Sequence, residues 1–397
     1  MIERIAYRLL RETSPKILWN FAYNFGWKSM CSVNAFKRRL KHGEFFPAFM
    51  VLSLTNRCNL SCQGCWVSPT DPPRELSLEQ VNNVINCCKA KGSYFFGLLG
   101  GEPLLYNGLL DIIAAHPDCY FQVFTNGLLL TEEIAQAMRR LGNVTPLISV
   151  EGLEQVSDIR RGGKDVYKRA VSGVAASTGA GLVTGVAASI CKSNFNELVN
   201  RDFAEDLIRR GVHYLWYYIY RPVGPRPTPE LALDKEQIVE LRRFIVNLRC
   251  EVPLVIVDAY WDKDGKALCP GAVGLSHHIN SSGDIEFCPP LQFSKDNIGT
   301  GADLPAIIAK SDFLASFRKM AADSTRGCII MENPELMKQF LEQQQAADSS
   351  GRGSGYEELS AMQPRPCHHL PDSEIPEKHW AYRFAKKYWF FGFGAYG

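Results

Sequence analysis

The stretch TNRCNLSCQGCW, residues 55–66, places Cys58, Cys62 and Cys65 at CxxxCxxC spacing directly after the apolar run Ala48 to Leu54. A short apolar run of this kind is typical of a buried strand, so the cysteines are expected in the loop that follows it. Soft thiolates select zinc, cuprous copper or iron–sulfur clusters. Three thiolates on a four-iron cluster leave one iron open, whereas a zinc knuckle needs a further ligand from elsewhere. Three unrelated buried cysteines are the remaining alternative.

Outward from this loop, apolar runs alternate with helical patterns up to about residue 262. That alternation predicts repeated βα units and a parallel sheet. The expected strands are Ala48 to Leu54, Tyr94 to Leu99, Tyr120 to Phe124, Thr145 to Val150, Leu182 to Ile190, His213 to Tyr220 and Leu254 to Val257. The expected helices are Leu78 to Ala90, Glu132 to Leu141, Val166 to Ser177, Phe195 to Arg210 and Lys235 to Leu248, with Ser77, Thr131 and Asp234 as capping residues. We therefore expect an α/β fold, a partial (β/α)6 TIM-like barrel over residues 48–262, with functional loops at the carboxyl ends of the strands.

Polar motifs follow the expected strands in order. They are Gly100-Gly101-Glu102-Pro103 after the second strand, Thr125-Asn126-Gly127 after the third, Ser149-Val150-Glu151-Gly152 after the fourth, and Arg160-Arg161-Gly162 in the next loop. Glycine is needed where backbone must approach a ligand closely, and a guanidinium pairs well with a carboxylate. Taken singly, each motif is equally typical of a turn or a solvated charge. Their position along one edge of the sheet is what connects them.

Together, the cysteine triad and these motifs resemble the radical S-adenosylmethionine (radical SAM) superfamily across residues 48–260. The resemblance implies a 4Fe-4S cluster on Cys58, Cys62 and Cys65 with an open iron that chelates S-adenosylmethionine. It implies cleavage of S-adenosylmethionine to a 5′-deoxyadenosyl radical that abstracts hydrogen from a substrate. The implied cofactor contacts are Gly64, Gly100, Gly101, Glu102, Pro103, Asn126, Ser149, Glu151 and Arg161. The chain departs from the family at Gly64, where an aromatic residue often stands, although that contact is largely made by backbone.

A second, cysteine-rich module is expected over residues 263–342. It contains Cys269 and the stretch INSSGDIEFCPP, with Gly283 five residues before Cys288. This pattern resembles the start of the auxiliary-cluster extension called SPASM, or its shorter form Twitch, which implies a second 4Fe-4S cluster. Cys328 and Cys367 are available to complete four-thiolate ligation. The alternative is that these cysteines are buried free thiols.

The charge of the chain is uneven. The formal net charge is +2, yet residues 1–50 carry nine basic and three acidic side chains. We expect a basic amphipathic segment over 1–47, a flexible Gln/Ser/Gly/Pro-rich linker over 343–366 and an aromatic and basic segment over 367–397. Both ends suit either a membrane surface or packing that closes the open mouth of the barrel. The sequence shows no signal peptide and no run of about 18 apolar residues, so reduced cysteines and a cytoplasmic protein are expected, with peripheral membrane contact as the variant.

Three functional hypotheses follow. The first is an enzyme that oxidises or cross-links a peptide or protein side chain, supplied by an external one-electron donor of the flavodoxin or ferredoxin type. The second is an enzyme acting on a lipid or other apolar metabolite at a membrane, and the third is a non-catalytic electron carrier. Nucleic acid is not expected as a partner. No catalytic base is assigned. The candidates to face the substrate radical, all near late strand ends, are Tyr217, Tyr218, Arg221, Asp258 and Tyr260. Of these, Asp258 is expected at the surface.

Overall fold

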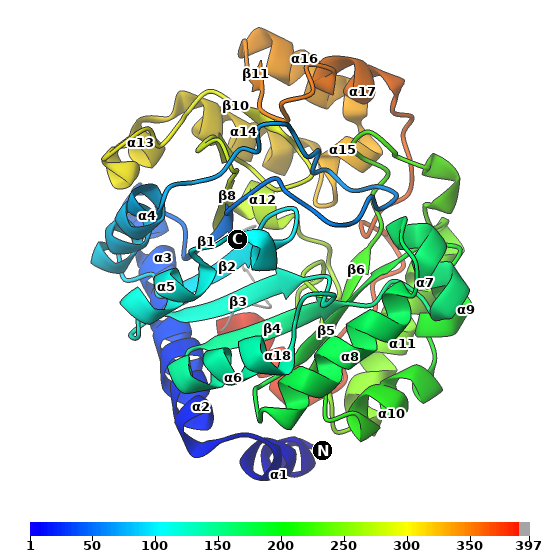
Figure 1. Cartoon of the computed structure of the whole chain (residues 1–397). Coiled ribbons are helices and arrows are strands. Elements are labelled where there is room, and N and C mark those ends of the chain that lie inside the picture. The colour runs from blue at the N-terminus through cyan, green and yellow to red at the C-terminus, as the bar shows by residue number, and fades with distance from the viewer. Residues whose placement is uncertain (389–397) are drawn as a thin grey trace.

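The computed structural model describes residues 1–388, and its central feature is a nine-stranded sheet in the order β7-β6-β5-β4-β3-β2-β1-β8-β9 (Figure 1). All neighbouring pairs from β7 to β8 are parallel, and only β9 runs antiparallel. The strands are β1 Phe49–Ser53, β2 Phe95–Leu99, β3 Tyr120–Thr125, β4 Val144–Ser149, β5 Gly185–Ile190, β6 Tyr214–Ile219, β7 Val255–Val257, β8 Ser276–Ile279 and β9 Ile285–Glu286. The seven strands expected from the sequence are therefore all present.

Helices separate these strands, and the expected capping residues start three of them. Ser77 and Asp234 form capping boxes with Gln80 and Gln237, and Thr131 accepts a hydrogen bond from the backbone N–H of Ile134. The helices of this part are α4 Leu78–Ala90, η2 Pro103–Leu105, α5 Leu109–Ala115, α6 Glu132–Leu141, α7 Glu154–Arg161, α8 Val166–Gly179, α9 Phe195–Leu198, α10 Arg201–Arg209, η3 Pro229–Leu231 and α11 Lys235–Glu251. The helix expected over residues 195–210 is interrupted, because the Asn200 side chain accepts from Phe203 N–H and starts a new helix.

The N-terminal segment covers the amino ends of the strands. It comprises α1 Ile2–Glu12, α2 Pro15–Asn20, the π-helix η1 Phe21–Trp27 and α3 Lys28–Lys41. Its side chains donate to backbone carbonyls in the loops that lead into successive strands: Arg8 to Val212 and Pro253, Lys16 to Arg140, Asn20 to Gly142, Lys28 to Asp118 and Arg39 to Lys91. The segment therefore packs on the barrel, but at the end opposite to the open mouth that the sequence suggested.

The expected flexible linker over residues 343–366 instead contains regular structure. β11 (Ala347–Asp348) pairs with β10 (Phe293–Ser294), and α17 spans Gly355–Ala361. Arg352 explains this difference, because it donates to the Trp66 carbonyl and pairs with Glu358 at 2.7 Å. The segment is thus fixed by these polar contacts together with the burial of Ala346 and Leu359. The remaining helices of the module are α12 Pro270–Val273, α13 Leu304–Lys310, α14 Asp312–Ser324, α15 Ile329–Glu332 and α16 Pro334–Gln343.

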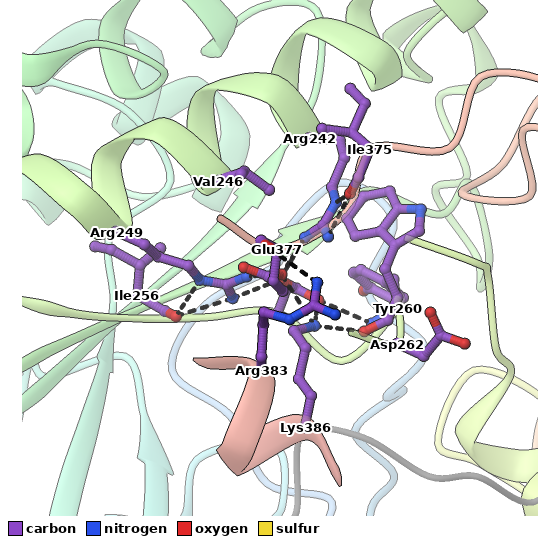
Figure 2. A network of polar contacts seen from close by, with 12 residues as sticks. Arg242, Val246, Arg249, Ile256, Tyr260, Asp262, Ile375, Glu377, Arg383 and Lys386 are labelled. Atoms are coloured by element: carbon purple, nitrogen blue, oxygen red, sulfur yellow. Dashed lines mark hydrogen bonds and ion pairs between the residues drawn. The ribbon is translucent and has the colours of Figure 1, made fainter. Parts of the chain in front are cut away.

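A buried ionic cluster joins the C-terminal segment to the barrel (Figure 2). Arg242 and Arg249 of α11 meet Glu377, and Lys386 of α18 (Trp380–Tyr388) lies 3.0 Å from Asp258, which follows β7. Burial alone would raise the pKa of the Asp258 carboxyl, but Lys386 and the two guanidinium groups hold it well below its usual range. The expectation that Asp258 is exposed is therefore wrong, because a carboxylate can be buried when it is paired. Residues 389–397, the end of the expected aromatic and basic segment, lie outside the described residues.

Replacing Arg8 with Met tests the contribution of the N-terminal segment to stability. The substitution removes charged hydrogen bonds to the carbonyls of Val212 and Pro253, both at 2.9 Å, and leaves those acceptors unpaired. We expect a loss of about 2 kcal/mol, measured as a lower urea midpoint at unchanged slope. Arg11→Met is the control, since Arg11 is exposed and contacts Tyr7; it should change stability by less than about 0.5 kcal/mol. Equal losses in the two variants would contradict the assigned role.

Candidate functional site

The loop that carries Cys58, Cys62 and Cys65 crosses the carboxyl edge of the sheet and is fixed by backbone hydrogen bonds on both sides. Gln63 N–H donates to the carbonyl of Arg160 at 2.9 Å, at the end of α7. Gly64 N–H donates to the carbonyl of Arg226 at 2.6 Å, in the segment after β6. The loop is therefore held by two elements more than 90 residues downstream, which places its thiols beside the ends of several strands.

The three thiols are free and surrounded by protein. Burial raises the pKa of Cys58 to about 11 and that of Cys65 to about 12, and neighbouring Cys62 adds to both shifts. Arg161 opposes the rise at both thiols. Buried thiols with raised pKa values become thiolates when a positively charged metal group supplies the compensating charge. Three partly buried thiols in one loop, two of them with raised pKa values and all beside the Arg161 cation, fit an iron–sulfur cluster.

Arg161 faces this loop with unused hydrogen-bonding capacity. Burial lowers its pKa, but the cysteines and Glu151 raise it more, so the guanidinium is held in its charged form. Its Nη1 lies 3.8 Å from Glu151 Oε1, and its Nε has no hydrogen-bond partner among the described residues. Arg160 also approaches Glu151, at 3.5 Å, and leaves its Nε and Nη1 without partners in the same part of the chain. Unpaired buried donors beside three thiols fit an anionic group of a bound cofactor.

Gly101 and Glu102 bring the end of β2 against the cysteine loop. Gly101 N–H donates to Thr55 O and Glu102 N–H donates to Arg57 O, both at 2.7 Å. A Cβ atom on Gly101 would lie 2.1 Å from Arg57 O, so only glycine fits there. The Glu102 side chain points inward, where it accepts from Thr125 Oγ1 at 2.7 Å and Asn126 N–H at 2.8 Å. The structure thus places Glu102 as a support between two strand ends.

The other predicted cofactor residues lie along the same edge. Pro103 begins η2, and Asn126 donates its side-chain amide to Asn59 in the cysteine loop at 2.7 Å. Ser149 ends β4 and is half-buried, while the Glu151 carboxylate also accepts from Ser189 N–H. The sequence motifs are therefore brought together, because parallel strands end at a common edge.

The arrangement of acidic, histidine and cysteine side chains bears on the zinc alternative. Over residues 1–388, no group of three or more such side chains is placed to hold a single metal ion. A structural zinc site requires four ligands directed at one point at about 2.0–2.3 Å. The thiolates of a polynuclear cluster bind different metal atoms and need only line a common space.

A second set of thiols surrounds the buried side chain of Arg221, just after β6. Arg221 Nε donates to Cys328 Sγ at 3.2 Å, and its charge opposes the burial that raises the pKa of Cys269 to about 11 and of Cys288 further. Cys367 Sγ accepts from the backbone N–H of Cys328 at 3.3 Å. Three of the predicted cysteines, Cys269, Cys288 and Cys328, thus interact with one cation, and Cys367 lies beside Cys328.

The segment after β6 contributes more to the site than the sequence indicated, where Arg221 was one candidate among several late strand-end residues. Besides Arg221, it provides Tyr220, whose ring would lie 2.2 Å from a Cβ on Gly64, and Gly224, where a Cβ would lie 2.0 Å from Cys65 O. Tyr220 also packs under the Arg160 guanidinium at 4.5 Å. One short segment thus contacts both thiol sets. The only signal in the sequence was the position of this segment at a strand end.

Comparisons with known proteins agree with this geometry. Residues 52–199 match the family model described as the Radical SAM superfamily. The sporulation killing factor maturation protein SkfB of Bacillus subtilis is 34% identical over 62% of this chain and 57% of its own length. The GTP 3′,8-cyclase of Parasynechococcus marenigrum is 32% identical over 48% and 54%, and the PqqA peptide cyclase of Streptomyces rochei is 26% identical over 61% and 69%. The chain spans little more than half the length of the first two relatives.

Solved structures share the fold. Streptococcus suis SuiB bound to the precursor peptide SuiA superposes with a TM-score of 0.59 at 16% identity, over 72% of this chain and 70% of SuiB. The structure of anSMEcpe with bound AdoMet gives a TM-score of 0.54 at 13% identity, over 70% and 86%. These likenesses confirm the expected partial barrel. Residues 52–199, with the cysteine triad in their first loop, therefore form a domain that matches the Radical SAM superfamily.

Proposed function

We propose that this protein is a radical SAM enzyme that modifies a side chain of a peptide or protein. The observation that carries the proposal is the loop of three partly buried thiols facing Arg161, at the carboxyl edge of a radical SAM domain. With Cys58, Cys62 and Cys65 as ligands, a 4Fe-4S cluster with an open iron would pass an electron to S-adenosylmethionine and release a radical that abstracts hydrogen.

The surrounding residues have distinct parts in this proposal. Arg161 offers charge and an unpaired Nε to the carboxylate of S-adenosylmethionine, and Glu151 fixes the position of Arg161. Gly101 keeps the backbone close to the loop without a side chain. Glu102 acts on the backbone rather than on a ligand, because both of its oxygens accept protein hydrogen bonds. Electrons come from outside the chain, so the proposal includes a donor of the flavodoxin or ferredoxin type.

We also propose that Cys269, Cys288, Cys328 and Cys367 hold a second 4Fe-4S cluster. Four thiols are the usual complement for such a cluster, and these four gather around Arg221. A buried guanidinium that donates to a ligand sulfur stabilises negative charge on the cluster and so favours its reduced form. Both the position and the residue type of Cys328 and Cys367 therefore support them as ligands of this cluster.

The names of the relatives support a peptide or protein as substrate. SkfB is named as a maturation protein, the Streptomyces rochei relative as a peptide cyclase, and SuiB was solved with a precursor peptide. The lipid alternative receives no such support. Trp19, Trp27 and Trp380 are exposed, but Arg8 and several other basic side chains of the N-terminal segment bind backbone carbonyls of this chain. We therefore favour the peptide hypothesis.

Two structural findings relate to location. No helix within residues 1–388 is both long and apolar enough to cross a membrane. All thirteen cysteines are free thiols, as is usual for proteins of a reducing compartment. We include a cytoplasmic location in the proposal for that reason.

Release of 5′-deoxyadenosine tests the enzymatic proposal. The full chain, reconstituted anaerobically with iron and sulfide and given dithionite and S-adenosylmethionine, should release 5′-deoxyadenosine. Replacing Cys58, Cys62 or Cys65 with Ala should abolish the release, because each removes a proposed ligand. Cys31→Ala is the control, since Cys31 is exposed on α3 and distant in sequence from both sets. A protein that holds the cluster by electron paramagnetic resonance but releases nothing would contradict the proposal.

Iron counting tests the second cluster. The reconstituted chain should hold about eight iron atoms, and about four should remain after Cys269→Ala with Cys288→Ala or after loss of the first triad. Cys328→Ala and Cys367→Ala should each lower the second count, because each removes a proposed thiolate. Cys250→Ala, an exposed cysteine, should leave eight. An unchanged count in Cys367→Ala would remove Cys367 from the ligand set.

Gly64→Ala tests whether the loop needs its close contact with Tyr220. Gly64 has φ +70°, and an added Cβ would lie 2.2 Å from the Tyr220 ring. We expect the loop to shift and iron at the first triad to fall about threefold or more, since strain of this kind costs roughly 1–3 kcal/mol. Gly92→Ala is the matched control, because Gly92 also has a positive φ, +79°, and a Cβ there meets nothing within 4 Å. Iron content equal to that of the unaltered protein would show that the contact is dispensable.

A further inference from the structure

Ser53, His278 and Glu286 form a continuous hydrogen-bonded line across three strands. His278 Nε2 lies 2.8 Å from Ser53 Oγ, and His278 Nδ1 lies 2.6 Å from Glu286 Oε2. β8 carries His278 between β1 and β9, and His278 stands directly opposite Glu286 in the β8–β9 pairing. The exposed fractions of the three residues are 5%, 1% and 0%. The line is thus buried and built into the sheet.

The surroundings of Glu286 fix the orientation of the imidazole. Glu286 Oε1 accepts from Asn280 Nδ2 at 2.9 Å and from Ser349 Oγ at 2.5 Å. Its second oxygen lies 2.6 Å from His278 Nδ1, and we assign Nδ1 as the donor of that bond. Nε2 of the neutral ring is then an acceptor, and Ser53 donates its hydroxyl proton to it. The adjacent His277 forms no comparable chain of hydrogen bonds, since neither of its ring nitrogens has a partner among the described residues.

This line ends at a pocket beside the cysteine loop. Ser53 and His278 line the pocket together with Trp66, Val67 and Ser68, which directly follow Cys65 in the chain. The cavity in it measures about 20 Å³, which is room for about one water-sized group. The Trp66 indole N–H is buried there without a partner among residues 1–388. A polar pocket with an unused donor is built to receive a polar group.

Ser53 also lies on the inner face of the barrel. Side chains alternate along a strand, so Ser53 shares its face with Val51. A Cβ on Gly97 of β2 would lie 3.5 Å from Val51 and 3.2 Å from the Phe124 ring, which places these residues on one side of the sheet. Leu52 points to the other side, into the core beneath the helices. The serine therefore faces the side on which a substrate would meet the cysteine loop.

We propose that Ser53 and His278 accept a proton from a thiol or hydroxyl group of the substrate, with Glu286 as the positioning residue. The substrate X–H proton passes to Ser53 Oγ while the Ser53 proton passes to His278 Nε2. The substrate is left as an anion, the imidazole becomes a cation beside the Glu286 carboxylate, and no electron moves. Imidazole is suited to this step because it exchanges protons near neutral pH, and the thiol is the side-chain group closest to it in acidity.

The inference rests on the proposed function for the identity of the substrate, but its test does not. Methanesulfonyl fluoride reacts with a serine whose proton is taken by a neighbouring base: the Ser53 oxygen bonds to sulfur, fluoride leaves and the proton goes to His278. The reconstituted full chain is treated with this reagent, and modification of Ser53 is timed by peptide mass spectrometry. The 5′-deoxyadenosine assay is run separately on the same preparation.

We expect Ser53 to be sulfonylated in the unaltered protein and about 100-fold more slowly in His278→Gln, since a positioned general base contributes on the order of 10²–10⁴. Glu286→Gln should slow the reaction, and Glu286→Asp should restore part of it, which a merely structural carboxylate would not do. Ser281→Ala is the control, because Ser281 lines the same pocket without touching His278. Circular dichroism checks that each variant is folded.

Two results would overturn the inference. One is the absence of Ser53 modification in the unaltered protein, and the other is an equal rate in His278→Gln. Either result can occur while 5′-deoxyadenosine is still released. In that case only the proposed proton-accepting role of Ser53 and His278 is contradicted. Conversely, rapid sulfonylation without 5′-deoxyadenosine release would support the Ser53–His278 pair and contradict the proposed radical chemistry.

Discussion

The parallel pairing of β1 with β8 is the constraint on which the rest of the molecule depends. Val51 pairs with His278 and Leu52 with Ile279, so the strand of the cysteine-rich module extends the barrel sheet in register. Parallel strands end at the same edge, which brings the turn at Gly283 and the cysteine that follows it to the side of the Cys58 loop. Without this pairing, β1 would be an open edge and the two thiol sets would have no fixed relation.

Features that depend on short stretches of sequence were predictable. The seven strands and the caps at Ser77, Thr131 and Asp234 follow from local patterns, because a strand or a helix start is set by a few neighbouring residues. The strand-end motifs could be placed on one edge because a parallel topology leaves no other arrangement. The helix break at Asn200 escaped prediction, since an asparagine within a helical pattern signals a cap only through its side-chain bond to Phe203.

Features that depend on distant contacts were not predictable in the same way. Arg221 was only one candidate among late strand-end residues, and its position among the cysteines arises from folding of segments over 100 residues apart in sequence. Composition wrongly predicted a flexible linker over residues 343–366, because distant contacts order it: the polar bonds of Arg352 and the burial of Leu359 in the core. Composition likewise misjudged Asp258, because its burial depends on a lysine that lies far along the chain. Ion pairs between residues far apart in the chain produce no periodic pattern in the sequence, so they cannot be predicted from it.

The ionic cluster around Glu377 has a consequence for the order of biosynthesis. Cys367 stands ahead of Glu377 and Lys386, the residues that dock the last described segment onto the barrel. A ribosome releases the loop with Cys58 long before it releases Cys367. The first thiol set therefore leaves the ribosome with its own strand, whereas the second is complete only when synthesis is nearly finished. The topology in that sense separates the two thiol sets in the order of synthesis.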